Sequence, residues 1–275
     1  MTDRTAAERK RPGRRGFILG SAAFAAAGLA ALRPKTALGR EPLPAVGSWP
    51  WPEKGLDPVA TAGAPATGLG GCANVSFGLI VRRLRDALPD SAWAAVPELL
   101  AGYGNGGGPY GSDCGALQGP LLLLNLLGAP PTLRQELYKW YCGFPFPSED
   151  WDDLYPFKRT LRTVARSPLC HESRAIWEGA YIRRAYDGAT YDNTRCAKLP
   201  RDCVRRAVEL VNAWKAEGYA GSWAPDAGSE GCYDCHTQLN RDKRPGGIHS
   251  GREDCTRCHT VVTSHGTTKT GGPDK

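Results

Sequence analysis

Residues 232–236, Cys-Tyr-Asp-Cys-His, and residues 255–259, Cys-Thr-Arg-Cys-His, determine how the C-terminal part of this chain must be built. In each pentapeptide two thiols lie three residues apart, and a histidine follows at once. This spacing lets both thiols form thioethers with the vinyl groups of one haem while the adjacent histidine ligates the iron. The motifs therefore predict two haem c groups per chain. Their thioether residues are Cys232, Cys235, Cys255 and Cys258, and their proximal ligands are His236 and His259.

Two further histidines of this stretch, His249 and His265, are the candidate distal ligands. His249 follows His236 by thirteen residues, and the loop between them contains Pro245-Gly246-Gly247, so it can pass round a haem edge. His265 follows His259 by only six residues. Six extended residues span at most about 20 Å, so closing on its own haem looks strained. We expect His265 to ligate the iron of a neighbouring haem, or of a haem in the second subunit of an isologous homodimer. His171 is the alternative ligand if His265 does not bind iron.

Other chemistries fit parts of the same pattern. Two C-x-x-C pairs about twenty residues apart also suit a four-cysteine zinc ribbon, although zinc gives no reason for a histidine after each pair. A multihaem reductase would need one open iron position and polar groups that bind a substrate, and the sequence shows no such constellation. A thiol–disulfide oxidoreductase lacks a C-x-x-C pair outside the haem motifs. The pattern favours an electron-transfer protein over an enzyme.

The N-terminus predicts export. Arg14-Arg15-Gly16-Phe17-Ile18-Leu19 opens an apolar run that ends near Leu32, and Ala37-Leu38-Gly39 offers small residues for cleavage. This pattern resembles a twin-arginine signal peptide over residues 1–39 and predicts a periplasmic protein. The alternative is a membrane anchor, since about sixteen apolar residues approach spanning length. Cleavage would leave no stable membrane span. Because this route carries folded proteins, the signal also suggests a cofactor inserted before export.

The charge of the chain does not indicate a nucleic-acid partner. The formal net charge is +7, but residues 1–39 hold eight basic and two acidic residues. The remainder therefore carries about +1, and ionised haem propionates would make the holoprotein weakly acidic. No basic surface is left for nucleic acid.

The middle of the chain has a helical pattern. Residues 40–71 are rich in proline and glycine and predict a wrapped or loosely ordered arm. Helices are expected from Cys72 to Pro89, from Trp93 to Leu100 and then through the leucines 121–124, and also over residues 132–141, 157–165, 172–186 and 202–217. The prediction is an all-α helical bundle domain over 72–218, followed by a loop-rich dihaem segment over 219–275.

Six cysteines remain outside the haem motifs, and in an exported protein they are able to form three disulfides. A cluster assembled before export would instead account for the twin-arginine signal. Iron–sulfur clusters commonly take four thiolates. Cys170, Cys196 and Cys203 are near one another in sequence and precede the haem segment, so they are ranked with Cys114 as candidate ligands. Cys72 and Cys142 are held in reserve.

These cysteines also carry a resemblance. The chain resembles the C_GCAxxG_C_C family of redox-active proteins over about 150 residues, in Gly71-Cys72-Ala73, the glycine-rich run 102–109, Cys114-Gly115-Ala116, Cys170 and Cys196-Ala197-Lys198. Joined to two C-x-x-C-H motifs, the whole looks like a split-Soret cytochrome c. The resemblance implies an exported, dimeric dihaem electron carrier with stacked haems and an iron–sulfur centre, for which we favour a two-iron, two-sulfur cluster. Its partners would be periplasmic redox proteins.

Overall fold

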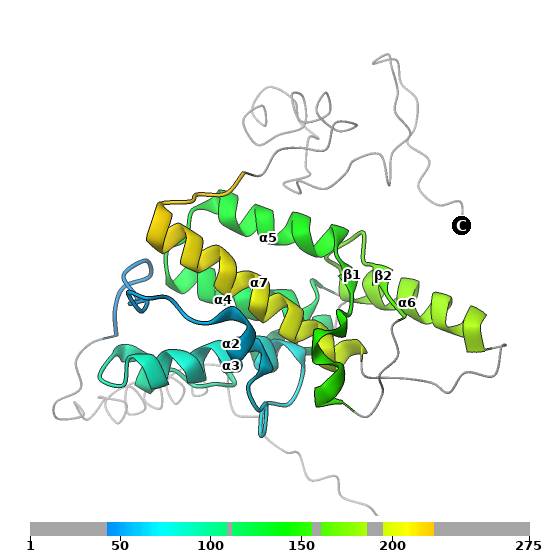
Figure 1. Ribbon diagram of the computed structural model, residues 1–275, viewed down its shortest axis with the longest axis horizontal. Coiled ribbons are helices and arrows are strands. Elements are labelled where there is room, and N and C mark those ends of the chain that lie inside the picture. The colour runs from blue at the N-terminus through cyan, green and yellow to red at the C-terminus, as the bar shows by residue number, and fades with distance from the viewer. Residues whose placement is uncertain (1–42, 109–111, 156–160, 186–194, 223–275) are drawn as a thin grey trace, which may run out of the picture. The chain divides into compact units, whose positions relative to one another are not determined.

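A long amphipathic helix, α7 (Arg195–Glu217), runs across the middle of the structure. Val204, Val208 and Val211 form its buried stripe, as the sequence predicts, and Gly218, with φ +70°, follows its last turn. The helix begins seven residues, about two turns, before the predicted start at 202, and the side chains of Lys198 and Leu199 in these extra turns are buried. In Figure 1, α7 lies between α5 (Pro131–Gly143) on one side and α2 (Pro58–Gly63) with α3 (Cys72–Ala87) on the other.

This computed structural model describes residues 43–108, 112–155, 161–185 and 195–222, and from 44 onward they belong to one compact unit. The unit is built from helices with one small sheet, which confirms the all-α prediction. Within these residues no helix is long and apolar enough to cross a membrane.

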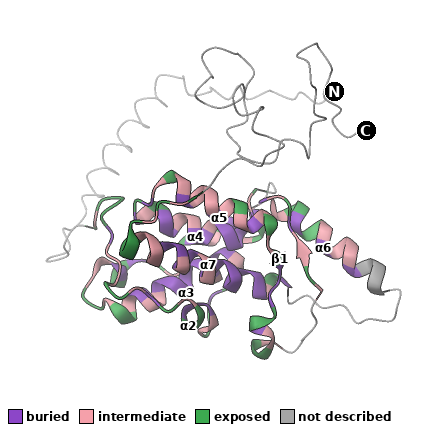
Figure 2. Ribbon diagram, turned by 45° about the horizontal axis from the view of Figure 1, so that its top comes forward, coloured by how far each residue is buried: buried purple, intermediate pink, exposed green. Residues whose placement is uncertain are grey.

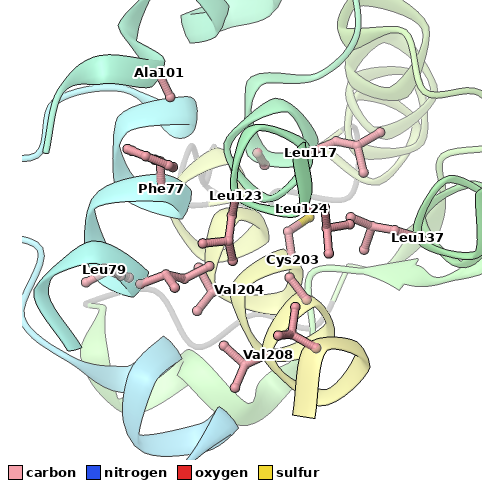
Figure 3. Packing of buried hydrophobic residues seen from close by; sticks show 14 of the residues in the cluster. Phe77, Leu79, Ala101, Leu117, Leu123, Leu124, Leu137, Cys203, Val204 and Val208 are labelled. Carbon is pink, nitrogen blue, oxygen red and sulfur yellow. The ribbon is translucent and has the colours of Figure 1, made fainter. Parts of the chain in front are cut away.

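The core lies where α3, α4 (Gly115–Leu126) and α7 meet. Phe77 and Leu79 from α3, Leu117 and Leu123 from α4, and Val204 from α7 are buried there (Figure 3). Figure 2 shows buried residues concentrated on these three helices. Burial of this much apolar surface supplies the main favourable free energy of folding.

The proline- and glycine-rich arm is wrapped onto the helices rather than loose. Trp49 packs against Trp93 with ring centroids 4.7 Å apart, and the indole of Trp93 donates a hydrogen bond to the carbonyl of Pro50 (2.7 Å). The indole of Trp51 donates to the side-chain oxygen of Asn212 on α7 (3.1 Å). The arm also contains the short helix α2, which the sequence pattern missed because proline at its start and alanine-rich turns give little periodicity.

Between α4 and α6 (Cys170–Ala185) the chain departs from the predicted pattern. The helix α5 is present, with Leu133, Leu137 and Tyr141 buried. The helix predicted over 157–165 is wrong at its described end, because Thr163–Val164 form strand β2, antiparallel to β1 (Pro145–Phe146). Between these strands lies the 3-10 helix η3 (Glu149–Leu154).

The predicted helix from Trp93 to Leu100 is replaced by two 3-10 helices, η1 (Ala92–Ala95) and η2 (Leu100–Gly107). Glycines of η2 do not sustain an α-helix, because glycine has more conformational freedom to lose than other residues. The segment between η1 and η2 is held to α3 by Glu98, which pairs with Arg82 and Arg85 at 2.7 and 2.6 Å. The contact of η2 with the first turn of α3 comes from Asn105, whose side-chain oxygen accepts from the N–H of Ala73 at 2.9 Å.

Candidate functional site

The predicted haem residues lie outside the described residues. Thioether cysteines, proximal histidines and distal histidines all fall in 223–275. Their ligand roles therefore stay predictions. The six other cysteines are all described, and all are free thiols, so the structure does not contain the three disulfides considered from the sequence.

Four of these thiols lie at the starts of four different helices. Cys72 is the first residue of α3, Cys114 is the N-cap of α4, Cys170 is the first residue of α6 and Cys196 is the second residue of α7. A helix N-terminus carries partial positive charge and free N–H groups, which favour a thiolate over a thiol. We call these four residues the helix-start thiols.

Three of them interact in a row, with Cys114 between Cys72 and Cys170. The hydrogen bond with Cys114, with burial and charge repulsion, raises the pKa of Cys72. The Cys170 thiol is the main cause that raises the pKa of Cys114 to about 11, whereas the hydrogen bond with Cys114 lowers the pKa of Cys170. Cys170 is thus the thiol of the row whose pKa is lowered, while hydrogen bonds within the row, more than charge repulsion, raise the pKa of Cys72 and Cys114. A bound metal cation would favour the thiolate form of all three.

Backbone contacts explain why these thiols meet. Asp113 and Leu169 form an isolated antiparallel bridge, next to which Cys114 donates its N–H to the carbonyl of Pro168 (2.7 Å) and Cys170 to that of Ser112 (3.1 Å). The starts of α4 and α6 are therefore joined directly.

Glycines of the run 102–109, together with Gly115 of α4, let the backbone lie close to the thiols. A side chain at Gly107, whose φ is +77°, would meet the Cys170 side chain at 2.5 Å, and one at Gly115 would meet the Cys72 sulfur at 2.5 Å. The N–H of Gly106 donates to the Cys72 sulfur at 3.4 Å. Asn105 caps α3, because its side-chain oxygen accepts from the N–H of Ala73 at 2.9 Å. The η2 segment thus covers Cys72 with backbone and side-chain amide groups.

Cys196 lies near the row but is exposed. Its charge acts on Cys170, and its sulfur lies 3.9 Å from Nη1 of Arg195. Arg195 is buried and its Nη2 donates to the hydroxyl of Ser173 at 2.6 Å. That hydroxyl lies 3.2 Å from the Tyr141 hydroxyl, which in turn interacts with Cys114. Sequence patterns did not single out Arg195; its position directly before Cys196 was the only signal.

The remaining candidates have other surroundings. Cys203 is fully buried on α7, and Figure 3 shows it among the core leucines. Burial is the main cause that raises its pKa well above the usual value. Cys142 is half-buried in the last turn of α5, where its carbonyl accepts a hydrogen bond from the N–H of Arg166 (2.9 Å). The reserve haem ligand His171 is exposed. The structure therefore favours Cys72, the former reserve, over Cys203 as a member of the candidate site.

The donors that this site offers are sulfur atoms. Among the described residues, no group of three Cys, His, Asp or Glu side chains is placed to hold one metal ion. Cysteine sulfur is the donor that iron–sulfur clusters take, so the donor type fits such a group.

Comparison with known proteins gives one likeness. No family model matches the chain, and no curated protein matches it. Its fold is similar to that of the split-Soret cytochrome c from Desulfovibrio desulfuricans, for which a novel iron centre has been described. The TM-score is 0.60 and the sequences are 23% identical, over 79% of this chain and 92% of that chain. At this identity the likeness shows that the two chains share a fold.

Proposed function

We propose that this chain is an exported dihaem c-type cytochrome of the split-Soret kind, which transfers electrons and carries an additional iron–sulfur centre. One combination of observations carries the proposal. Two C-x-x-C-H motifs occur in the same chain as a helical unit whose fold is similar to that of a split-Soret cytochrome c. Neither a zinc ribbon nor a thiol–disulfide oxidoreductase accounts for both features.

The haem segment over 219–275 would hold its cofactors through the residues assigned from the motifs. His236 and His259 would be proximal ligands, and His249 and His265 distal ones. Ligation by two histidines leaves no open iron position, so this arrangement suits electron transfer rather than catalysis. The short spacing before His265 supports a homodimer in which this histidine serves a neighbouring haem.

The helix-start thiols would hold the iron–sulfur centre. Cys72, Cys114 and Cys170 interact directly, and Cys196 is the nearest exposed thiol in addition. When bound, such a centre supplies a one-electron store. The chain contributes four helix N-termini and the N–H of Gly106, which favour the thiolate form and shield it from solvent on the η2 side.

Export by the twin-arginine route supports the same assignment. A centre buried under η2 and bound by residues from four helices would have to be inserted as the chain folds, before transport. The signal peptide over 1–39 would then be cleaved and the protein released into the periplasm. Its partners there would be donor and acceptor redox proteins.

The test is the haem content and spin state of the purified holoprotein. We expect about two covalently bound haems per chain in the alkaline pyridine spectrum and low-spin spectra without carbon monoxide binding. His236→Ala should disturb one haem. His171→Ala should leave both haems low-spin, because His265, and not the reserve His171, is proposed as the second distal ligand. A protein that contains zinc and no haem would overturn the proposal, and rapid carbon monoxide binding would overturn ligation by two histidines.

A further inference from the structure

Arg195 is a buried cation with no carboxylate partner among the described residues. Only 3% of its surface is exposed, and within the described residues it forms no ion pair with Asp or Glu. Its Nη2 donates to Ser173, while its buried Nε has no hydrogen-bond partner among the described residues. An uncompensated buried charge is costly. A guanidinium in this position therefore calls for negative charge close by.

In the part of the chain that the structure describes, the groups near Arg195 that can carry negative charge are the thiols of Cys196 and Cys170. Nη1 lies 3.9 Å from the sulfur of Cys196. Arg195 also interacts electrostatically with Cys170. Because Cys170 belongs to the row of interacting thiols, Arg195 faces the candidate metal centre from the side of α7.

A second line of contacts leads from Arg195 to the same row. Its Nη2 reaches Ser173, whose hydroxyl lies 3.2 Å from that of Tyr141, and Tyr141 interacts with Cys114. Ser173 and Tyr141 are both wholly buried. A guanidinium has only donors, whereas both hydroxyls can rotate to accept on one side and donate on the other. The hydrogen bonds can therefore all point from Arg195 toward the sulfur of Cys114.

We infer that Arg195 is a positioning residue that holds a positive charge beside the thiolate-bound iron–sulfur centre and raises its reduction potential. This inference rests on the proposed function. Reduction adds one electron, supplied by a donor redox protein, and thus one negative charge, with no bond made or broken. A fixed cation nearby stabilises the reduced form more than the oxidised form, since net charge is among the factors that set these potentials.

The experiment is a reductive titration of the holoprotein with dithionite, in which the cluster is followed by electron paramagnetic resonance. In Arg195→Gln the equilibrium between reduced and oxidised cluster should shift at least tenfold toward the oxidised form, which is about 59 mV for a one-electron couple. Arg195→Lys keeps the charge and should stay within threefold of the wild type. Ser173→Ala, which removes the oxygen that holds the guanidinium, should shift the equilibrium in the same direction by a smaller factor.

Arg201 provides the matched control. It is also buried on α7, but it donates to the carbonyls of Ala62 and Ala64 and to the Tyr155 hydroxyl. Arg201→Gln should weaken the fold and leave the cluster potential unchanged. A normal cluster signal with an unchanged potential in both Arg195→Gln and Ser173→Ala overturns the role of Arg195 alone. Absence of any cluster signal in the wild type overturns the iron–sulfur proposal itself, and this inference with it.

Discussion

The first turn and the middle of α7 place two cysteines in opposite surroundings. Cys196 is exposed at the helix start, next to a buried guanidinium, whereas Cys203, seven residues later, is fully buried in the core. The other helix-start thiols lie between these extremes, because Cys114 is buried at the edge of the core and Cys72 and Cys170 are half-buried against it. Position along a helix, rather than distance in sequence, decides whether a thiol is suited to bind metal or to fill space.

The largest expected effect comes from removing the central thiol of the row. Cys114→Ala should abolish the iron–sulfur centre, because Cys114 interacts with both Cys72 and Cys170. Cys203→Ala should keep the centre and lose only about 1 kcal/mol of stability from reduced apolar burial. The readout is the cluster signal in electron paramagnetic resonance, together with thermal melts. Loss of the centre in Cys203→Ala with retention in Cys114→Ala would reverse the contrast.

A substitution in the apolar core tests the other region, through its effect on the free energy of unfolding. Leu124→Ala should lower the free energy of unfolding by roughly 2–5 kcal/mol, as large-to-small changes at fully buried positions do. Leu99→Ala, at a position that is 53% exposed, should stay within about 0.5 kcal/mol. Denaturant titration of both variants gives the comparison. Equal effects at the two positions would mean that the core is not where the structure puts it.

Replacing Asn105, the η2 residue whose side chain caps α3, should have a smaller effect on stability. It should also change the reactivity of the thiol site. Asn105→Ala removes the acceptor for the N–H of Ala73, which should cost about 1 kcal/mol. It also uncovers Cys72, so reaction of this thiol with an alkylating reagent in metal-free protein should become faster. Asn105→Asp keeps an acceptor and should restore most of the stability. Alkylation of Cys72 at an unchanged rate in Asn105→Ala would contradict a covering role for η2.

The smallest effect is expected at Glu98, at the surface outside both regions. Arg82 first, and then Arg85, hold the pKa of this carboxyl below its usual value. A lowered folded-state pKa gives stability that is present above the unfolded-state pKa of about 4.3 and is lost as pH falls through the folded-state pKa.

Glu98→Gln should therefore cost about 1 kcal/mol or less at neutral pH, and the difference from the wild type should shrink as pH falls toward 3. Thermal melts across this pH range measure it, with the exposed Glu53→Gln as control. A difference that stays constant with pH would show that the ion pair does not supply the stability.

The sequence predicted the helices that have a clear apolar stripe and missed those without one. The buried faces of α5 and α7 follow from residues such as Leu137 and Val208 at helical spacing. The helix α2 and strand β2 are too short to show a period, and their conformation depends on tertiary contacts.

The sequence predicted that cysteines form the candidate site, but it did not predict which cysteines they are. Sequence proximity ranked Cys203 above Cys72, yet residues that meet in space come from helix starts far apart in the chain. Cys72 and Cys114 are brought together because α3 packs against α4. Arg195 belongs to no sequence motif. Its role depends on its burial, and the apolar periodicity of a helix does not predict whether the first residue of that helix is buried.

The most direct test of the contrast between helix-start thiols and core is the iron and acid-labile sulfide content of the purified holoprotein. If the helix-start thiols hold a two-iron, two-sulfur cluster beside two haems, the protein contains about four irons and two sulfides per chain. About two irons and no sulfide would contradict the account, because the thiols at the starts of α3, α4, α6 and α7 would then bind no cluster.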